Sequence, residues 1–304
     1  MRTPGKTQGA NPPWARLRTP AKVSLTLQVL GQRKDGYHDV RLVLVPVSLY
    51  DTLRLQSTPG IPLSLEVDSA EELGPVEDNL VWRAARRFER AVGVALQARM
   101  RLTKGIPSGA GLGGGSGNAA GTLVALNALH GFPLSPEALI AEAAALGSDV
   151  PFFIEARPAV CEGRGEVLTP LAGVPRLTLL VVKPAFSIGT ADAYQALAAS
   201  RAGRPAPAPA PLADLSTVDA VVAALHNDFE GVLSARYPEL AEIRGSLAAA
   251  GALGAVLTGS GSAVIGLFRD RSQRDRAAER LGREGRWTVL PCETLAGHSY
   301  EFES

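Results

Sequence analysis

The sequence predicts an α+β protein built from two closely packed lobes. Its 304 residues can bury either one large core or two lobes of ordinary size, and we favour two lobes. Short runs of apolar and β-branched residues alternate with alanine- and leucine-rich segments of helical spacing, so strands and helices are mixed along the chain. A dense cluster of glycines also lies where a predicted strand leads into a predicted helix, a position suited to binding an anion.

The composition favours small, mobile ligands over nucleic acid or membranes. Lysine and arginine total 31 against 30 aspartate and glutamate residues, so no strong net field attracts a polyanion. Cys161 and Cys292 form neither a CxxC pair nor a disulfide framework, as expected of a protein in a reducing cytoplasm. Residues 1–18 are polar, rich in proline and glycine, and lack the apolar region of a secretory signal, so we expect a disordered tail. No uncharged apolar run reaches the roughly 20 residues that cross a bilayer.

Residues 19–172 are predicted to form the N-terminal lobe, which begins with strands. Residues 21–56 have the short apolar runs of a β-hairpin, interrupted by a polar segment at 32–39. Further strands are expected at 61–69 and at 96–107. The last of these strands leads directly into the glycine cluster.

The first two helices of this lobe have recognisable ends. One begins at Asp78 or Asn79, residue types that cap helices, and ends near Gly93. The other covers 118–130, with the alanine and leucine content of a buried helix, and Gly131 is placed to stop it. The glycine cluster therefore precedes a helix N-terminus.

A third helix and a strand complete the predicted lobe. Ser135 is the expected cap of this helix, Pro136 its first residue and Gly147 its end. Asp149 follows directly, before an apolar segment at 151–156 that has the composition of a strand. An acidic side chain is thus placed between two buried elements.

Residues 173–304 are predicted to form the C-terminal lobe. A proline- and alanine-rich stretch at 204–214 is expected to be a surface loop. The expected elements are a strand at 177–184, a helix after Thr190, a long helical region from Val218 to Ala250, strands at 251–257 and 262–269, a charged helix at 272–285 and a strand at 287–293.

The glycine cluster is the clearest chemical signal in the sequence. Within IPSGAGLGGGSGNAAG, glycines occupy positions 109, 111, 113, 114 and 115, where the missing Cβ atoms let backbone N–H groups converge on an anion. No lysine follows as in GxxxxGK[ST], and the spacing matches a dinucleotide-binding GxGxxG poorly. A lone GxG is more often a flexible turn, but this density before a helix indicates phosphate binding.

Three segments together resemble the GHMP kinases, a family named for galactokinase, homoserine kinase, mevalonate kinase and phosphomevalonate kinase. PSGAGLGGGSGNAA resembles the central motif of the family, PAKVSLTLQVLG its first motif and GAVLTGSGSAVIGLF its third, and they occur in the expected order. The resemblance implies a two-lobed α+β GHMP kinase fold with an N-terminal mixed-sheet lobe and a C-terminal ferredoxin-like lobe. ATP and an acceptor alcohol are expected to meet in the cleft between the lobes.

Further segments resemble one branch of this family, whose members phosphorylate a cytidine diphosphate derivative of a sugar alcohol. These segments are GYHDV, DNLVWRAA, LGSDVPFFI, GRGEVLTPL, KPAFSIGTADAY and NDFE. The resemblance implies transfer of the γ-phosphate of ATP, with Mg²⁺, to a hydroxyl of that small molecule. Neither nucleic acid nor a membrane is an expected partner, and a homodimer is left open.

Phosphoryl transfer needs a positioned hydroxyl, cations near the migrating charge and a carboxylate that accepts the proton. The resemblance implies that Lys22 and Asp149 are the catalytic pair, with Asp149 as the base. Taken singly, an aspartate before Val-Pro more often caps a turn, and a lysine after Pro-Ala is more often a solvated surface charge. The motifs around both residues favour the catalytic interpretation.

The resemblance also implies a set of nucleotide contacts. Asn79 is expected near the adenine, although helix capping alone would equally explain it. The hydroxyl of Ser116 is expected near the magnesium ion. The residues expected to bind ATP are Asn79, Pro107, Gly109, Ala110, Gly111, Leu112, Gly113, Gly114, Gly115, Ser116, Gly117 and Asn118.

A second set is expected to bind the acceptor. His38 is expected to hydrogen-bond the cytidine base, while Tyr37 and Tyr194 stack on it from two sides. A lone histidine or tyrosine is more often structural, so these roles depend on the resemblance. The residues expected to bind the acceptor are Ser24, Tyr37, His38, Asp149, Thr190, Tyr194, Gly259, Ser260 and Gly261.

The chain departs from the family motifs at two positions. Ser24 stands where the first motif usually has asparagine, so we expect a weakened or water-bridged substrate contact. Gly117 stands where the central motif usually has a second serine, which would require reorganised magnesium binding if that serine faced the metal. The stretch from Gly163 to Glu166 also matches the family, and a turn before a strand is its expected structure.

Two alternative functions remain at this point. A mevalonate or homoserine kinase would share the phosphate loop but not the GYH segment at 36–38. A binding or regulatory protein could keep the fold without catalysis. The presence of Lys22 and Asp149 argues against that second alternative, whereas Ser24 and Gly117 keep it open.

Overall fold

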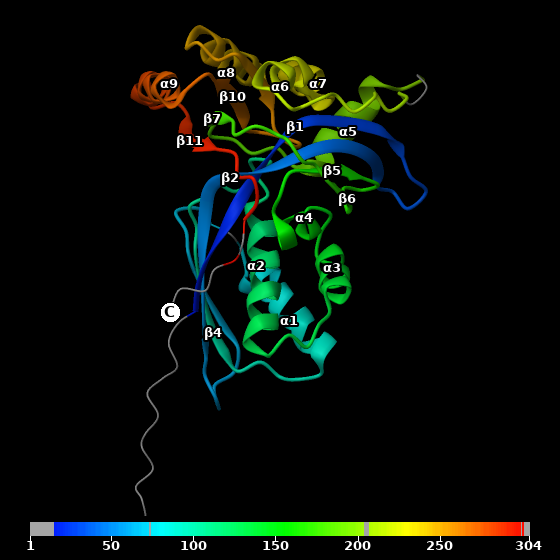
Figure 1. Cartoon of the computed structure of the whole chain (residues 1–304), viewed down its shortest axis with the longest axis vertical. Coiled ribbons are helices and arrows are strands. Elements are labelled where there is room, and N and C mark those ends of the chain that lie inside the picture. The colour runs from blue at the N-terminus through cyan, green and yellow to red at the C-terminus, as the bar shows by residue number, and fades with distance from the viewer. Residues whose placement is uncertain (1–14, 73, 204–206, 299, 301–304) are drawn as a thin grey trace, which may run out of the picture.

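The computed structural model describes residues 15–72, 74–203, 207–298 and 300. Within these residues the chain forms two lobes, each built on its own β-sheet (Figure 1). The larger sheet has the order β3-β4-β2-β1-β8, with β5 paired to β2 and β6 paired to β5, and the smaller sheet has the order β11-β7-β10-β9. The two-lobed α+β architecture expected from the sequence is confirmed.

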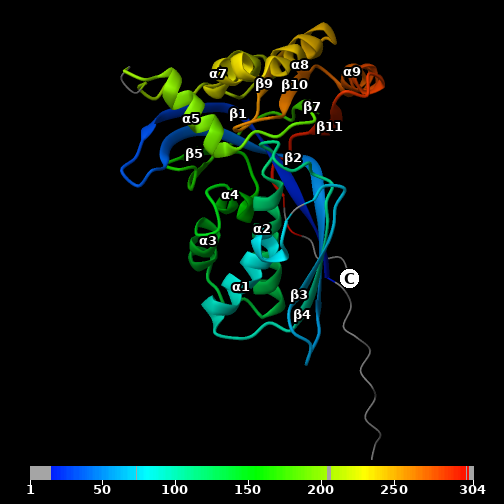
Figure 2. The same ribbon diagram turned by 180° about the vertical axis from the view of Figure 1, so that it is seen from behind.

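A long antiparallel hairpin forms the backbone of the larger sheet. Its strands are β1 (Ala15–Gln32) and β2 (His38–Ser57), which run from the helical lobe to the underside of the other lobe (Figures 1 and 2). The expected hairpin is therefore confirmed. Residues 15–18 belong to β1 and not to a disordered tail, because Leu17 alternates inward and is buried. The rest of the predicted tail, residues 1–14, lies outside the described residues.

Three helices pack together beside this sheet (Figure 2), and their predicted C-terminal ends agree with the structure except that the third stops at Ala144, before the expected Gly147. The Asn79 side chain accepts a hydrogen bond from Val81 N at the start of the first, and Gly93 ends it in the left-handed conformation. Ser135 caps the third. The elements here are β3 (Ser64–Asp68), α1 (Leu80–Val92), β4 (Ala98–Thr103), α2 (Gly114–Leu129) and α3 (Pro136–Ala144).

The apolar segment after Asp149 is a helix and not the expected strand. It forms α4 (Val150–Glu155), in which Pro151 occupies the first turn and Ala156 ends the helix in the left-handed region. Both Phe152 and Phe153 are buried against the core, so an apolar run without periodicity fits a short helix as well as a strand. The strands that follow are β5 (Ala159–Glu162) and β6 (Val167–Pro170), joined by the expected turn at 163–166.

In the second lobe, α7, α8 and α9 pack against the smaller sheet, while α5 packs on α7 and α6 on β1 (Figure 1). All neighbouring strands in that sheet are antiparallel. Its elements are β7 (Thr178–Lys183), β9 (Gly254–Leu257), β10 (Val264–Phe268), β11 (Thr288–Glu293), α5 (Thr190–Ser200), α6 (Val218–Ala224), α7 (Phe229–Arg236), α8 (Pro238–Ala249) and α9 (Arg271–Arg283). None of the helices in the described part of the chain is long and apolar enough to cross a bilayer.

The expected long helix from Val218 to Ala250 is divided into three. The short strand β8 (His226–Asn227) separates the first two helices and pairs in parallel with β1, and Pro238 begins the third helix. The proposed boundary at residue 172 falls between β6 and β7, which lie in different sheets. Because β8 returns to the first sheet, that boundary stays a prediction. Of the expected proline-rich loop, residues 207–214 are exposed and without regular structure, and 204–206 lie outside the description.

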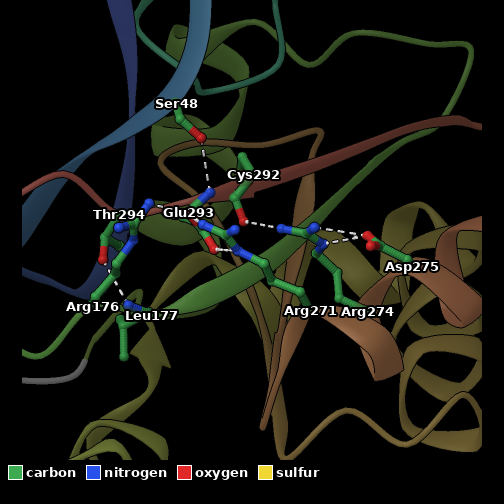
Figure 3. A network of polar contacts seen from close by, with 9 residues as sticks. All are labelled: Ser48, Arg176, Leu177, Arg271, Arg274, Asp275, Cys292, Glu293 and Thr294. Carbon is green, nitrogen blue, oxygen red and sulfur yellow. Dashed lines mark hydrogen bonds and ion pairs between the residues drawn. The ribbon is translucent and has the colours of Figure 1, made fainter.

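Glu293, at the end of β11, contacts the second lobe through its side chain and the first lobe through its backbone (Figure 3). Glu293 is 8% exposed and its carboxylate accepts hydrogen bonds from Arg271 and Arg176. Its backbone N–H donates to Ser48 Oγ in β2 at 3.0 Å, so the same residue contacts both sheets. The hydrogen bond from Arg271, with further support from Arg176, lowers the pKa of Glu293 to about 2.

This pKa predicts how the stability of the protein depends on pH. Because the folded pKa is about 2 against an ordinary 4.5, the carboxylate stabilises the fold above 4.5 and loses that effect as the pH falls toward 2. We expect Glu293→Gln to lower the free energy of unfolding by about 1–2 kcal/mol at neutral pH, and the difference from wild type to shrink on acidification. Urea unfolding at neutral and acidic pH measures both.

The matched control is Glu242→Gln. Glu242 also accepts from an arginine, Arg286, but its side chain is 45% exposed, so a change below about 0.5 kcal/mol is expected. Equal effects of the two substitutions would show that the Glu293 contacts contribute no more than a surface ion pair.

Candidate active site

The glycine cluster forms a loop whose backbone is held in the conformation that glycine favours. Gly109, Gly111 and Gly113 have φ angles of 60°, 75° and 69°. Helix α2 begins at Gly114, four residues before the expected start, so the last glycines belong to its first turn. The N-terminal amides of this helix and the loop amides lie together, which is the arrangement that binds phosphate.

A cavity of about 320 Å³ lies against this loop. The residues expected to bind ATP line it with one exception, Gly117, and the cavity is also lined by the unexpected Leu80, Leu102, Lys104 and Ser108. Asn79 therefore both caps α1 and lines the cavity. The structure gathers the expected nucleotide residues around one volume.

Gly117 is buried away from this cavity. A Cβ atom at this position would lie 2.8 Å from the backbone oxygen of Pro20 in β1, so close packing between α2 and β1 accounts for the glycine. The structure does not place Gly117 in the lining of the nucleotide cavity, so its contact with the nucleotide stays a prediction. Its departure from the family motif therefore removes no side chain from the cavity.

The third glycine-rich segment packs directly on the phosphate loop. A Cβ atom on Gly111 would lie 2.3 Å from the carbonyl oxygen of Thr258, and Ala263 N donates to Ala110 O at 3.2 Å. A Cβ atom on Gly259 would in turn lie 3.1 Å from the backbone oxygen of Gly111. Two backbones meet here without intervening side chains, which explains the glycines in both motifs.

Ser24 has a different role from the one expected. It is 1% exposed, and its hydroxyl accepts a hydrogen bond from Gly259 N at 2.8 Å, while its own backbone N–H donates to Thr258 Oγ1. The Ser24 side chain is not among those that line the cavity around Lys22 and Asp149, where the acceptor is expected to bind. Ser24 therefore holds the third loop, and its expected contact with the substrate stays a prediction.

Asn227 holds the same loop from the opposite side. Its Nδ2 donates to Leu257 O and to Gly259 O, both at 2.8 Å, and the residue is 3% exposed. Asn227 is the first residue of the NDFE segment, which matched the family without an assigned function. The structure supplies that function, because β8 brings this amide to the end of β9.

Asp51, which no sequence motif indicated, holds the phosphate loop through hydrogen bonds from the larger sheet. It is fully buried, its Oδ1 accepts from Gly105 N and Ile106 N at 2.7 and 2.8 Å, and its Oδ2 accepts from Asn118 Nδ2 and from Lys104 Nζ. These partners lie at the two ends of the glycine loop. No local pattern around Asp51 signals this, since its partners lie more than 50 residues away.

Lys22 and Asp149 meet in a second cavity of about 250 Å³ on the other side of the loop. Lys22 Nζ lies 3.3 Å from Asp149 Oδ2, with the lysine side chain 4% and the aspartate 34% exposed. Gly109, Gly111 and Gly113 line both this cavity and the nucleotide cavity, so the loop separates them. Thr190, Gly259, Ser260 and Gly261 also line it, as expected of acceptor residues.

A third cavity of about 520 Å³ continues from this one. Tyr37, His38 and Tyr194 line it together with Asp149 and Thr190. The rings of His38 and Tyr194 stack on each other with centroids 4.4 Å apart, where the sequence had suggested a base between two tyrosines. Burial lowers the pKa of His38, so its imidazole is neutral at neutral pH and offers one donor and one acceptor.

Chemically, the three cavities form a path from a phosphate-binding loop to an aromatic pocket. Within the described residues, no group of three histidine, cysteine, aspartate or glutamate side chains is placed to hold a metal alone. Mg²⁺ that binds mainly to nucleotide phosphates needs few protein ligands, and the Ser116 hydroxyl at the nucleotide cavity fits this mode. The donor set therefore fits a magnesium nucleotide.

Comparison with known proteins agrees with this geometry. Residues 79–157 match the family model described as GHMP kinases N terminal domain, and residues 211–286 match that described as GHMP kinases C terminal. A 4-diphosphocytidyl-2-C-methyl-D-erythritol kinase from Pelotomaculum thermopropionicum is 43% identical over 265 residues, which cover 86% of this chain and 92% of the relative. One from Symbiobacterium thermophilum is 44% identical with coverage of 86% and 93%.

Solved structures show the same fold. A crystal structure of 4-(cytidine 5'-diphospho)-2C-methyl-D-erythritol kinase superposes with a TM-score of 0.77 at 34% identity and covers 92% of this chain and 98% of its own. A homoserine kinase from Cytophaga hutchinsonii has a TM-score of 0.72 at 17% identity, covering 99% and 100%, which shows a shared fold alone.

The contact between the two glycine loops leads to a specific prediction. Gly111→Ala places a methyl group on the Thr258 carbonyl, so the loop must move by about 1 Å, a displacement that typically costs roughly 100-fold in rate. We expect kcat/KM for ATP to fall by about that factor. The control is Gly231→Ala in α7, where a Cβ meets no neighbour within 4 Å. Unchanged kinetics in the Gly111 variant would refute the close packing described here.

Proposed function

This chain belongs to the GHMP kinase family, and we propose that it transfers the γ-phosphate of ATP to the 2-hydroxyl of 4-diphosphocytidyl-2-C-methyl-D-erythritol, a step in non-mevalonate isoprenoid precursor biosynthesis. The observation that carries the proposal is the position of the Lys22–Asp149 pair. It lies between a cavity lined by the phosphate loop and a cavity lined by His38 and Tyr194. A reacting hydroxyl at this pair would be within reach of both.

The phosphate loop supplies binding and electrostatic stabilisation. Residues 109–115, which include the first turn of α2, line the nucleotide cavity, where their amides would hold the β- and γ-phosphates of ATP. Lys104 adds a cation at the same cavity. Such preorganised donors stabilise charge on the migrating phosphoryl group without having to move during the reaction.

Asp149 would accept the proton of the acceptor hydroxyl. Its carboxylate is partly exposed to the acceptor cavity, while the buried Lys22 ammonium fixes one of its oxygens. Lys22 is also close to the phosphate loop, because its backbone N–H donates to Leu112 O at 2.9 Å. The pair therefore aligns a hydroxyl with the γ-phosphorus for in-line displacement. Mg²⁺, held by the phosphates and Ser116, would neutralise part of the phosphate charge.

The aromatic cavity would bind the cytidine end. The neutral imidazole of His38 offers one donor and one acceptor, as a cytosine base requires. Tyr37 is 51% exposed and Tyr194 lines the same cavity, so both rings provide stacking surface. Mevalonate and homoserine have no group that needs such a pocket, which favours the cytidylyl substrate over the two alternative kinases.

The direct test is ATP consumption by the purified protein with each acceptor in turn. We expect turnover with 4-diphosphocytidyl-2-C-methyl-D-erythritol and Mg²⁺, and none above background with mevalonate or homoserine. Phosphorus NMR of the product assigns the new phosphate to the 2-hydroxyl. Turnover with mevalonate or homoserine instead would replace this proposal by that kinase. ATP binding without turnover on any acceptor would identify a protein that has lost catalysis.

The role of Asp149 is tested by Asp149→Asn, which keeps the shape of the side chain but cannot take the proton. We expect kcat to fall by about 10²–10⁴-fold, the usual contribution of a general base, while ATP affinity stays within about twofold. The control is Glu155→Gln at the end of the same helix, whose exposed carboxylate only pairs with Arg157. Near-normal kcat in the Asp149 variant would remove this residue from the role of base.

A further inference from the structure

The turn between β5 and β6 brings an arginine into the acceptor cleft. Gly163 and Gly165 have φ angles of 68° and 114°, which allow the chain to reverse on both sides of Arg164. The turn is fixed by hydrogen bonds from Val40 N to Gly163 O at 2.8 Å and from Gly165 N to Glu162 O at 3.0 Å. Arg164 is therefore presented by a fixed turn that is joined to β2.

Arg164 lies where the catalytic cavity joins the aromatic cavity. It lines both of them, a property that it shares with Asp149, Thr190 and Tyr194. A Cβ atom on its neighbour Gly165 would lie 4.0 Å from Asp149 Oδ1, so the turn packs beside the catalytic carboxylate. If the two ends of an extended substrate bind at the aromatic cavity and at the Lys22–Asp149 pair, the group that links them lies between these two places, beside Arg164.

At the junction of the two cavities, one cationic side chain among the described residues is available to bind an anionic ligand. Of the described lysine and arginine residues, only Lys22 and Arg164 line the catalytic cavity, and only Arg164 lines the aromatic cavity. Lys22 already pairs with Asp149. Without Arg164, a diphosphate at the junction would face the Asp149 carboxylate, with the already paired Lys22 as the one other cation among the described residues that line the two cavities.

The Arg164 guanidinium contacts two neighbouring side chains, which hold it in place, but these contacts use only part of the group. Its Nε lies 3.3 Å from Glu166 Oε1, and its Cζ lies 4.7 Å from the centre of the Tyr37 ring. No acceptor among the described residues binds its two terminal nitrogens. These nitrogens present the planar, paired donors that bind phosphate oxygens well.

We infer that Arg164 binds the diphosphate that links the two ends of the acceptor. It thereby selects substrates with a charged bridge and sets the distance between the base, held at His38, and the hydroxyl, held at Asp149. The inference rests on the proposed function and adds to it the residue that recognises the bridge.

Two competitive inhibitors separate this role from simple packing on Tyr37. Cytidine carries the base alone, whereas cytidine diphosphate carries the base and the diphosphate. In Arg164→Met we expect the inhibition constant of cytidine diphosphate against the acceptor to rise by roughly 10- to 100-fold, as for loss of charge-assisted hydrogen bonds. The constant for cytidine should change less than about twofold, and KM for ATP should be unaffected.

Three comparison variants make the result specific. Arg164→Lys keeps a charge without the paired donors and should recover part of the lost affinity. His38→Ala should weaken cytidine and cytidine diphosphate alike, since it acts on the base. Arg41→Met is the control, because Arg41 pairs with Glu162 at the start of the same turn but lines neither cavity of the cleft.

The outcomes are distinct. Equal loss of both inhibitors in Arg164→Met would reduce Arg164 to a support for Tyr37, and unchanged affinity for cytidine diphosphate would exclude any contact with the bridge. Either result leaves the proposed function in place if wild type still phosphorylates the cytidylyl substrate. Absence of that activity in wild type would overturn both proposals together.

Discussion

The close approach of two backbones, at Gly111 and Thr258, is the constraint on which the site depends. Because no side chain intervenes, the phosphate loop can hold its positive-φ conformation only while the third loop stays in place. Ser24 and Asn227 fix that third loop from opposite sides, and Asp51 fixes both ends of the phosphate loop from within the larger sheet. The loop amides are thus preorganised by buried polar contacts from distant parts of the chain.

The same contacts position the catalytic pair relative to the nucleotide. Lys22 is on β1 and is tied to Leu112 in the phosphate loop, while Asp149 precedes α4, whose Phe153 packs beneath Gly113. The C-terminal lobe contributes the third loop and Thr190, and Glu293 holds that lobe to β2. An acceptor bound across both lobes therefore meets groups whose separation is set by the fold.

Local signals were sufficient to predict much of this structure, and long-range contacts account for what was missed. Asn79, Gly93 and Ser135 marked helix ends correctly because capping depends on neighbouring residues. The strand expected after Asp149 was wrong because a short apolar run carries no periodicity. The role of Ser24 could not be predicted, since its partner Gly259 lies 235 residues away. Lys22 and Asp149 were paired only through family resemblance, for the same reason.

The return of β8 to the first sheet has a consequence for biosynthesis of the chain. Its residues, His226 and Asn227, pair with Thr26 and Leu27 of β1, which precede them by 200 residues in the chain. The larger sheet therefore cannot be completed until that whole intervening segment and β8 itself have been synthesised. Nascent chains that stop short of this strand lack both Asn227 and the third loop that it holds, so their phosphate loop would be made without its contact to Thr258.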